Sequence, residues 1–303
     1  MFTGLRAHAT CLALIAALML PATMVSGQAP ARDRQGTGKG FIWKFERDGR
    51  IGWLVGSLHL LSADFYPLPA SMNQAFASAD MLVEEIDMEE ASNPAFAMMV
   101  LSKAMYPAGT TLSTDLSPAT YKVLTAWLSK NGLAVEAFQQ MKPWMVSLTL
   151  QTLALQRIGF DPAFGIDKHF ADNAQKSKKQ FLALETAAEQ IDFLDRLSKR
   201  TQDLMLRESL ESADTELTEI KAIASAWRVG DVAAVEKLAL SSLQDAPEVY
   251  QSLLVDRNRR WVPKIETCTQ TRRCFVVVGA AHLVGPDGLI ALLKQKGYAV
   301  EQQ

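Results

Sequence analysis

This sequence has no excess of positive charge and only a few histidines and cysteines, and the balance of charge already excludes a class of function. The 303 residues include 31 Lys or Arg against 33 Asp or Glu, a formal net charge of −2, so nothing is basic enough to predict nucleic-acid binding. No linker or low-complexity tract marks a domain boundary. With 49% hydrophobic residues, the chain is long enough to bury a full core. We therefore predict one α/β domain over residues 40–303, preceded by a flexible segment at 28–39.

The first 27 residues have the pattern of an export signal. Arg6 precedes an apolar run from Cys11 to Leu20, and small residues lead to Gly27. Pro21 breaks the run, so we predict a signal peptide over residues 1–27 and a periplasmic or secreted mature protein. The alternative is an uncleaved anchor, since the run with its flanks approaches the roughly 20 residues that span a bilayer. Only in that case do we expect membrane contact.

The three cysteines leave room for one disulfide. Cys11 departs with the predicted signal, and Cys268 and Cys274 remain as a closely spaced pair. In an oxidising compartment these two residues could close a small loop, whereas in a cytosolic chain they would stay reduced. We therefore predict a disulfide between Cys268 and Cys274 in the exported protein.

Two of the four histidines follow the same local pattern. The apolar segment Ile51 to Val55 is followed by Gly-Ser-Leu-His59, and Phe275 to Val278 by Gly-Ala-Ala-His282. A strand that ends in a glycine turn places the imidazole at the carboxyl edge of a sheet, where α/β folds bind ligands. One histidine after a strand is usually an ordinary loop residue. The repetition favours a shared site.

The remaining pattern alternates strands with long helical stretches. Aromatic and β-branched residues on both sides of Asp48-Gly49 predict a β-hairpin over 41–61. Helical spacing dominates 93–159 and 191–261. Further strands are predicted at Met81–Ile86, Gln180–Leu184 and Tyr298–Val300. The expected fold is α/β, with a central mixed, largely parallel sheet and a large helical insertion.

Carboxylates follow two of these strands. Glu84, Glu85 and Asp87 come at the end of one, and Glu185 follows the other. Strand alternation puts Glu85 and Asp87 on one face and Glu84 on the opposite face, so we predict Glu84 to be an ordinary surface acid. Glu185 has an alternative role as a favourable charge at a helix N-terminus.

If the strands are parallel neighbours, His59 and His282 meet these carboxylates at one edge. Two imidazoles with a carboxylate such as Glu85 are a plausible ligand set for a divalent transition metal, Mn, Co or Zn. A metal there would lower the pKa of bound water and supply a nucleophile. Without a metal, the same side chains could act as general base and acid. His169 lies beside Lys168 on what we predict to be a solvated helix face, so it is left out.

Several segments, taken in order, resemble the TraB/GumN/Tiki family. They are WLVGSLHLL, ADMLVEEIDM, GIDKHFADNA, LALETAAEQ, DRNRRW and VVVGAAHLVGPDGLIALLKQKGYAVE, which together span nearly all of the predicted mature chain. The resemblance implies an α/β fold related to the erythromycin-esterase and ChaN-like proteins and, for Tiki members, metal-dependent protease activity. It also implies active-site positions at His59, Glu85, Arg257 and His282. Glu84 stands where the family usually has an apolar residue.

Our first hypothesis is an exported hydrolase, a metal-dependent peptidase that acts on a peptide or other small substrate. His59, Glu85 and His282 would hold the metal, Arg257 would stabilise the oxyanion, and Glu85, Asp87 or Glu185 would complete the catalytic set. The alternative is a non-catalytic envelope protein that binds a metal or haem, or assists polysaccharide production. A hydrolase without metal, using His and Glu, stays open as a third possibility.

Overall fold

The computed structural model describes residues 39–303 apart from 242, 244 and 245, so the predicted signal peptide lies outside the described residues. Its centre is a six-stranded sheet with the strand order β4-β3-β5-β2-β1-β6. The strands are β1 (Ile42–Arg47), β2 (Arg50–Ser57), β3 (Met81–Glu84), β4 (Gln180–Ala183), β5 (Cys274–Gly279) and β6 (Ala299–Gln302).

The sheet is mixed and largely parallel, as predicted. β2, β5, β3 and β4 run parallel to one another, whereas β1 is antiparallel to both β2 and β6. The predicted hairpin joins β1 to β2. Asp48 and Gly49 adopt φ angles of 53° and 74°, the left-handed conformation that a two-residue hairpin turn requires and that the Asp-Gly pair tolerates.

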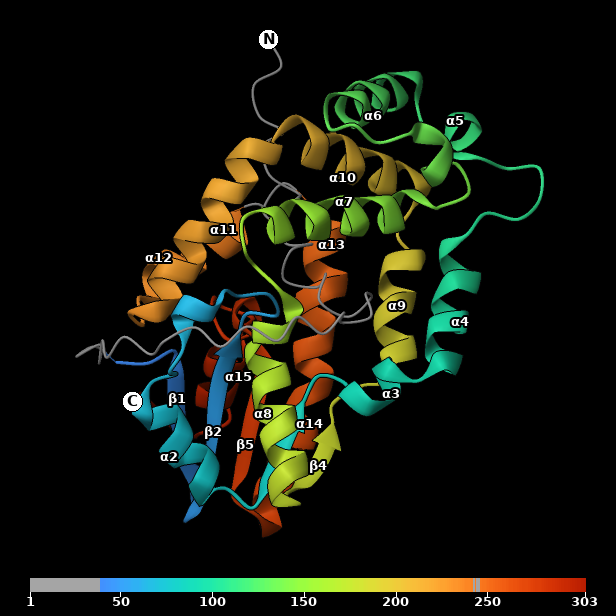
Figure 1. The fold of residues 1–303 in the computed structure, drawn as a ribbon. Helices are drawn as coiled ribbons and strands as arrows, with labels where there is room; N and C mark the ends of the chain where they lie inside the picture. The colour runs from blue at the N-terminus through green and yellow to red at the C-terminus, as the bar shows by residue number, and fades with distance from the viewer. Residues whose placement is uncertain (1–38, 242, 244–245) are drawn as a thin grey trace.

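Helices cover both faces of the sheet, as Figure 1 shows, with α2 and α8 on one face and α14 and α15 on the other. The helices around the sheet are α2 (Ala70–Ser78), α8 (Ile166–Ser177), α9 (Ala187–Asp195), α13 (Pro247–Tyr250), α14 (Asp256–Thr271) and α15 (Leu289–Gln295). Residues Gln251–Val255 form a π-helical turn between α13 and α14. Such turns occur often at functional sites.

The helical insertion lies beyond the carboxyl ends of the parallel strands (Figure 1). It consists of α3 (Met88–Ser92), α4 (Pro94–Ala104), α5 (Leu112–Asp115), α6 (Pro118–Lys130), α7 (Pro143–Arg157), α10 (Lys199–Glu211), α11 (Ala213–Arg228) and α12 (Val232–Ser241). Part of it has a core of its own, where Leu124, Leu150 and Leu206 pack together from α6, α7 and α10. Helices of the insertion therefore cover the carboxyl edge of the sheet.

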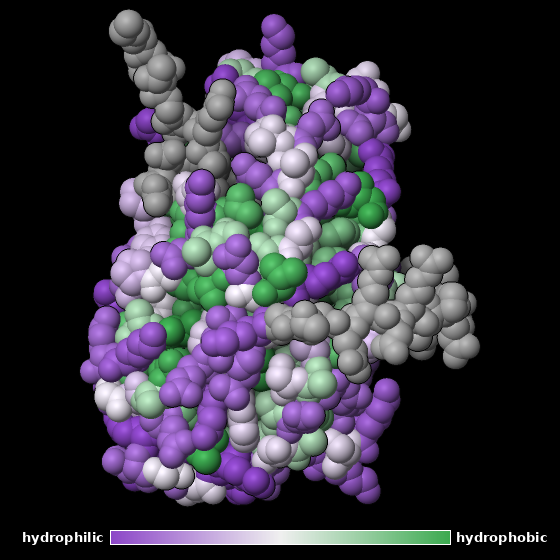
Figure 2. Space-filling model, turned by 90° about the vertical axis from the view of Figure 1, so that its left-hand side faces the viewer, coloured by the Kyte–Doolittle hydropathy of each residue, from purple (hydrophilic) through white to green (hydrophobic). Residues whose placement is uncertain are grey.

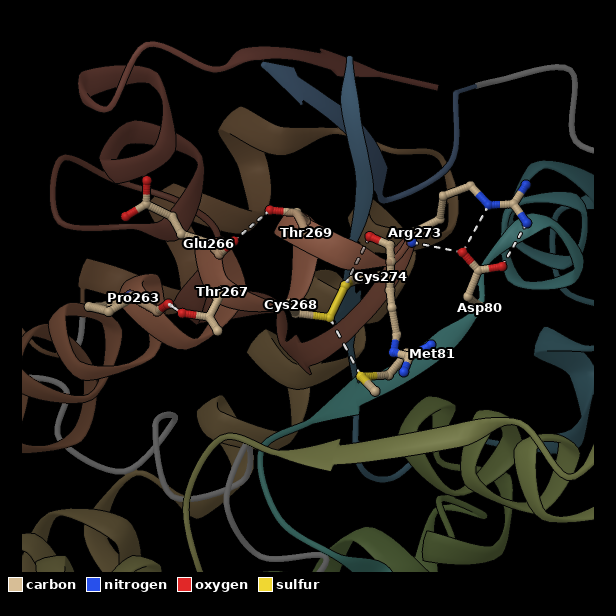
Figure 3. Close-up of a disulfide and its surroundings, with 10 residues drawn as sticks. Asp80, Met81, Pro263, Glu266, Thr267, Cys268, Thr269, Arg273 and Cys274 are labelled. Carbon is tan, nitrogen blue, oxygen red and sulfur yellow. Dashed lines mark hydrogen bonds and ion pairs between the residues drawn. A yellow bond between two sulfur atoms is a disulfide. The ribbon is translucent and has the colours of Figure 1, made fainter. Parts of the chain in front are cut away.

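A disulfide joins Cys268 in α14 to Cys274 at the start of β5, as predicted. Figure 3 shows it beside the first residue of β3, with the Cys268 sulfur 3.6 Å from the Met81 sulfur. The bond therefore connects α14 to β5 at the edge of the sheet opposite the carboxyl ends. Among the described residues, no helix is both long and apolar enough to span a bilayer.

Candidate functional site

His59 follows β2 and is held by Asp167 from α8. The His59 Nδ1 atom lies 2.9 Å from Asp167 Oδ1, and only 7% of the His59 surface is exposed. Gly165 makes this approach possible, because a side chain there would lie 2.4 Å from the His59 carbonyl oxygen. Burial alone would lower the pKa of His59, but the negative charge and hydrogen bond of Asp167 outweigh burial and raise it.

His282 follows β5 and has different partners. Its Nδ1 lies 2.7 Å from the amide oxygen of Asn258, which can only accept, so Nδ1 carries the proton. Its Nε2 therefore accepts from Arg257 Nη1 at 3.1 Å. Burial, followed by the positive charge of Arg257, lowers the pKa of His282 to about 3. This imidazole is neutral at any ordinary pH.

Glu85 follows β3, the neighbour of β5 in the sheet, and lies close to Arg257 of α14 and to His282. Its Oε1 accepts from the Gly279 backbone N–H at 2.7 Å, and its Oε2 accepts from Arg257 Nη2 at 2.6 Å and Gln190 Nε2 at 3.0 Å. Burial would favour the protonated acid, but Arg257 and the two imidazoles outweigh it and lower the pKa of Glu85 to about 2. Glu85 is a buried carboxylate that stays ionised.

Arg257 lies at the centre of the hydrogen-bond network that includes Glu85 and His282, and only 1% of its surface is exposed. Its Nε and Nη2 donate to Glu185, and Nη2 also donates to Glu85. Its Nη1 donates to the Leu253 carbonyl and to His282. A guanidinium has five N–H donors, and these bonds use all five. As placed, Arg257 can take the predicted oxyanion role only if it releases one of these partners.

Glu185 belongs to the same network rather than only to the start of α9. Besides Arg257, it accepts from Trp261 Nε1 at 3.3 Å and Gln190 Nε2 at 3.3 Å. Burial raises its pKa despite the opposing charge of Arg257. Arg257 thus faces two carboxylates, and the cluster as a whole carries little net charge.

The three predicted metal ligands surround Gly279 at the end of β5. A Cβ atom at Gly279 would lie 3.3 Å from Glu85 Oε1, 3.5 Å from His282 Cδ2 and 3.7 Å from His59 Nε2. Glycine therefore leaves open the space toward which these groups converge. No described residue hydrogen-bonds to His59 Nε2. The structure brings together His59, Glu85, Glu185, Arg257 and His282.

Asp87 lies outside this cluster. Its side chain caps α3 by accepting from the Glu89 backbone N–H at 2.8 Å. The prediction that Asp87 and Glu85 share a face assumed a strand continuing to Ile86, whereas β3 ends at Glu84. Strand alternation therefore does not extend to Asp87.

Glu84 is not the surface acid that we predicted. It is 2% exposed, and neither carboxylate oxygen has a hydrogen-bond partner. Burial raises its pKa well above the usual value. β3 is a central strand with helices on both faces, so its alternating side chains are buried on either side. His169 is half-buried rather than solvated, since its ring contacts Tyr66 and Phe170.

The partners of the two histidines were not among the predicted site residues. Asp167 and Asn258 lie in the segments GIDKHFADNA and DRNRRW, which carry the family resemblance and could have pointed to them. Gln190 and Trp261 also lie in segments of the resemblance, LALETAAEQ and DRNRRW, but only the folded chain shows that they lie within hydrogen-bond distance of Glu85 and Glu185.

The donor set fits a transition metal in ligand type, and an oxygen acceptor orients each histidine ring. Metal-binding histidines commonly donate their second N–H to an oxygen acceptor, as His59 does to Asp167 and His282 to Asn258. Glu85 Oε1 lies 3.9 Å from His282 Nε2. In this structure the lone pair of His282 Nε2 accepts a hydrogen bond from Arg257 Nη1. Within the described residues, no three His, Cys, Asp or Glu side chains yet stand close enough together to hold a metal.

The sequence of this chain matches the model of a known protein family. The model of the TraB/PrgY/gumN family matches residues 41–302. The chain belongs to this family. The match covers every strand of the sheet and every residue of the cluster around Gly279.

Named relatives fall into two groups. "Uncharacterized protein YbaP" of Escherichia coli (strain K12) is 26% identical over 246 residues, which cover 80% of this chain and 87% of that protein. "Metalloprotease TIKI1" of Danio rerio is 22% identical over 313 residues, 86% of this chain and 62% of the relative. "Metalloprotease TIKI2" of the same fish is 21% identical and is matched over 60% of its length. No solved structure matches the chain significantly, so the likeness to erythromycin-esterase and ChaN-like folds stays a prediction.

Proposed function

We propose that this protein is an exported hydrolase, a metal-dependent peptidase whose reaction centre is the space beside Gly279. The observation that carries the proposal is the matched orientation of His59 and His282. Each has its Nδ1 fixed by an oxygen acceptor, and both rings lie with Glu85 around Gly279. Two relatives named metalloproteases support the same reaction class.

His59, Glu85 and His282 would hold the metal. When bound, a divalent transition metal polarises a carbonyl group and makes water a nucleophile near neutral pH. Asp167 fixes the ring of His59 and keeps its Nδ1 protonated, so that Nε2 is directed at the reaction centre. Asn258 does the same for His282 without adding charge. Partners of this kind typically change metal affinity or activity by about 10- to 100-fold.

Arg257 and Glu185 set the protonation states of the ligands. The positive charge of Arg257 keeps Glu85 ionised, and burial together with this charge keeps His282 neutral. These are the forms in which both can donate a lone pair. Glu185 compensates this buried charge through its own ion pair with Arg257, at 2.6 Å. Gln190 donates to both carboxylates and fixes their relative position. Releasing His282 would free one N–H of Arg257 for a developing oxyanion.

A hydrolase without metal is the second candidate, and a specific contact favours it. Arg257 Nη1 donates to the same His282 nitrogen that a metal would use. The pKa of His59 is raised by Asp167, which suits a general base that accepts a proton through Nε2. In this mechanism His59 and Asp167 activate water, and the ion pair of Arg257 and Glu85 forms a fixed polar side of the site.

The test begins with metal analysis of the purified protein, followed by a screen of peptide cleavage before and after treatment with a chelator. We expect about one transition metal per chain and cleavage that the chelator abolishes and the metal restores. Glu85→Gln should lose both the metal and the cleavage, since it removes the charge while nearly keeping the shape. Glu136→Gln, an exposed glutamate in the helical insertion, is the matched control.

Other outcomes separate the alternatives. Cleavage that survives the chelator but is lost in Glu85→Gln supports the hydrolase without metal. Stoichiometric metal or haem without turnover of any peptide or ester supports a non-catalytic envelope protein, including one that assists polysaccharide production. Cleavage at full rate by Glu85→Gln would remove the proposed site altogether.

A further inference from the structure

The amino edge of the sheet, opposite the candidate site, concentrates positive charge. β2, β3, β4, β5 and β6 all run in the same direction, so they begin at this one edge. The four residues before each of β3, β4, β5 and β6, with the hairpin turn at 47–50, include eight basic residues and two acidic ones. Since the whole chain has a net charge of −2 and this edge +6, the remainder carries −8.

Some of these charges are neutralised locally. Arg273 pairs with Asp80 at 2.7 Å, as Figure 3 shows, and Arg47 and Lys296 share Glu266 at 3.4 and 3.6 Å. Five cations of this edge have no carboxylate within 4.0 Å among the described residues. We call them the basic edge: Arg50, Lys176, Lys178, Lys179 and Arg272. Lys176, Lys178 and Arg272 are exposed.

Helix dipoles explain only part of this pattern. Basic residues are favourable near helix C-termini, which accounts for Lys176 in the last turn of α8 and for Arg272 at the end of α14. Arg50 follows a hairpin turn and belongs to no helix. Lys178 and Lys179 add two further positive charges at the end of α8, where a single basic residue would complement the helix dipole. The surplus indicates a role outside the chain.

We propose that the basic edge docks the protein on the surface of an anionic phospholipid bilayer. Its cations extend from β4 to β2, across four strands spaced about 4.8 Å apart, which is wide enough to face several headgroups at once. Hydrophilic residues are frequent at the lower end of the side seen in Figure 2, and Lys176, Lys178 and Arg272 are exposed, so contact is electrostatic and without insertion. Such contact requires no uncleaved signal, and it leaves the carboxyl edge with the candidate site facing away from the membrane.

The experiment measures binding of the purified protein to phosphatidylcholine vesicles with and without phosphatidylglycerol by co-sedimentation. We expect binding only to the anionic vesicles, and its loss at high ionic strength. A triple variant with Lys176→Gln, Lys178→Gln and Arg272→Gln should lower the partition coefficient about 100-fold, since each basic residue near an anionic surface contributes about 1 kcal/mol.

The matched control removes the same charge from the helical insertion, through Lys122→Gln, Lys130→Gln and Arg200→Gln. All three are exposed residues of α6 and α10, and we expect the control to change binding by less than about threefold. Equal loss in both triple variants would overturn the proposal, because it would show a response to net charge alone. Absence of vesicle binding at low ionic strength, or binding only to a soluble anionic polysaccharide, would also overturn it. Circular dichroism of both variants separates loss of binding from loss of folding.

Discussion

The two Gly-x-x-His segments are alike in sequence and opposite in electrostatics. His59 pairs with a carboxylate, Asp167, and its pKa is raised. His282 pairs with a neutral amide and lies against Arg257, and its pKa is lowered to about 3. Both are almost equally buried, with 7% and 5% of their surfaces exposed. Because burial and local sequence are nearly the same, the difference between the two pKa values comes from the partners of each imidazole.

The two glycines differ as well. A Cβ at Gly56 would lie 2.4 Å from the Phe41 ring and 3.1 Å from the Ala280 backbone, so Gly56 is glycine because the two segments pack closely. The three atoms nearest to a Cβ at Gly279 all belong to the polar groups of the site, and none is closer than 3.3 Å. Gly56 is required for packing, and Gly279 leaves open the proposed reaction centre.

Removing the imidazoles gives the largest effect that we expect. If both serve one centre, His59→Ala and His282→Ala should each lower cleavage at least about 1000-fold, and the double variant should be little worse, since groups that act as a unit are not additive. Independent residues would instead give additive losses in free energy. Metal content and cleavage are measured together, with His169→Ala as the control.

The glycines provide the next test. Gly279→Ala should fold with nearly normal stability and lose about 100-fold in activity, because the methyl group fills the space between the ligands. Gly56→Ala should lower the free energy of unfolding by about 1–3 kcal/mol through overpacking. Urea unfolding and cleavage assays of both variants check this. The reverse assignment, with Gly279→Ala unstable and Gly56→Ala inactive but stable, would contradict the comparison.

Titration by NMR tests the electrostatic contrast directly. The ring protons of His59 should titrate above pH 6.5, and those of His282 should not shift until the protein approaches acid unfolding. Asp167→Asn makes the first segment resemble the second, so the pKa of His59 should fall, because burial is then opposed only by the weaker effect of the Glu85 charge. We expect about a 10-fold or larger loss of activity in this variant. An unchanged His59 pKa would contradict the assigned role of Asp167.

The same contrast gives opposite pH dependences of stability. His282 binds a proton in the unfolded chain below its ordinary pKa of 6.5 but not in the folded chain until about pH 3. Its contribution to stability is therefore present above pH 6.5 and is lost as the pH falls toward 3. His59, with a raised pKa, contributes stability below pH 6.5 that is lost as the pH rises through its folded pKa.

The disulfide should give the smallest effect. It joins β5, which leads to His282, to α14, which carries Asn258, whereas β2 and His59 have no such bond. For so short a loop, the lost chain entropy stabilises the fold by about 2 kcal/mol. Replacing both cysteines with alanine should therefore lower stability modestly and leave the pKa of His59 unchanged. Detection of free thiols in protein isolated without reductant would show that the bond is not formed.

Local patterns predicted the framework of the fold well. The hairpin at Asp48-Gly49, the strands leading to His59 and His282, and the order of strands and helices all rest on hydrophobic spacing and turn residues within a few positions. Asp87 was misplaced because β3 ends at Glu84, two residues earlier than predicted, and Glu84 was misplaced because helices cover both faces of this strand (Figure 1). Strand ends depend on neighbouring strands, which the local sequence does not contain.

Pairing across the fold was the part that sequence could not supply. Asp167 is 108 positions from His59, and Gln190 is 105 positions from Glu85. No periodicity links residues so far apart. Family resemblance pointed to Arg257, yet nothing in the sequence indicated that all five of its N–H groups are used within the cluster.

The π-helical turn at Gln251–Val255 affects the angular position of the residues that follow it around the helix axis. A π turn holds one more residue than an α-helical turn in nearly the same rise, so α13 and α14 are offset by one position along a single helical axis. Each residue of an α-helix adds about 100° of rotation. Deleting one residue from this turn would make the helix continuous and swing Arg257 about 100° away from Glu85 and Glu185, or else force α13 to rotate instead. The direction of the Arg257 side chain therefore depends on the number of residues in the π-helical turn. Deleting one residue from that turn would disturb its contacts as strongly as a substitution of Arg257 itself.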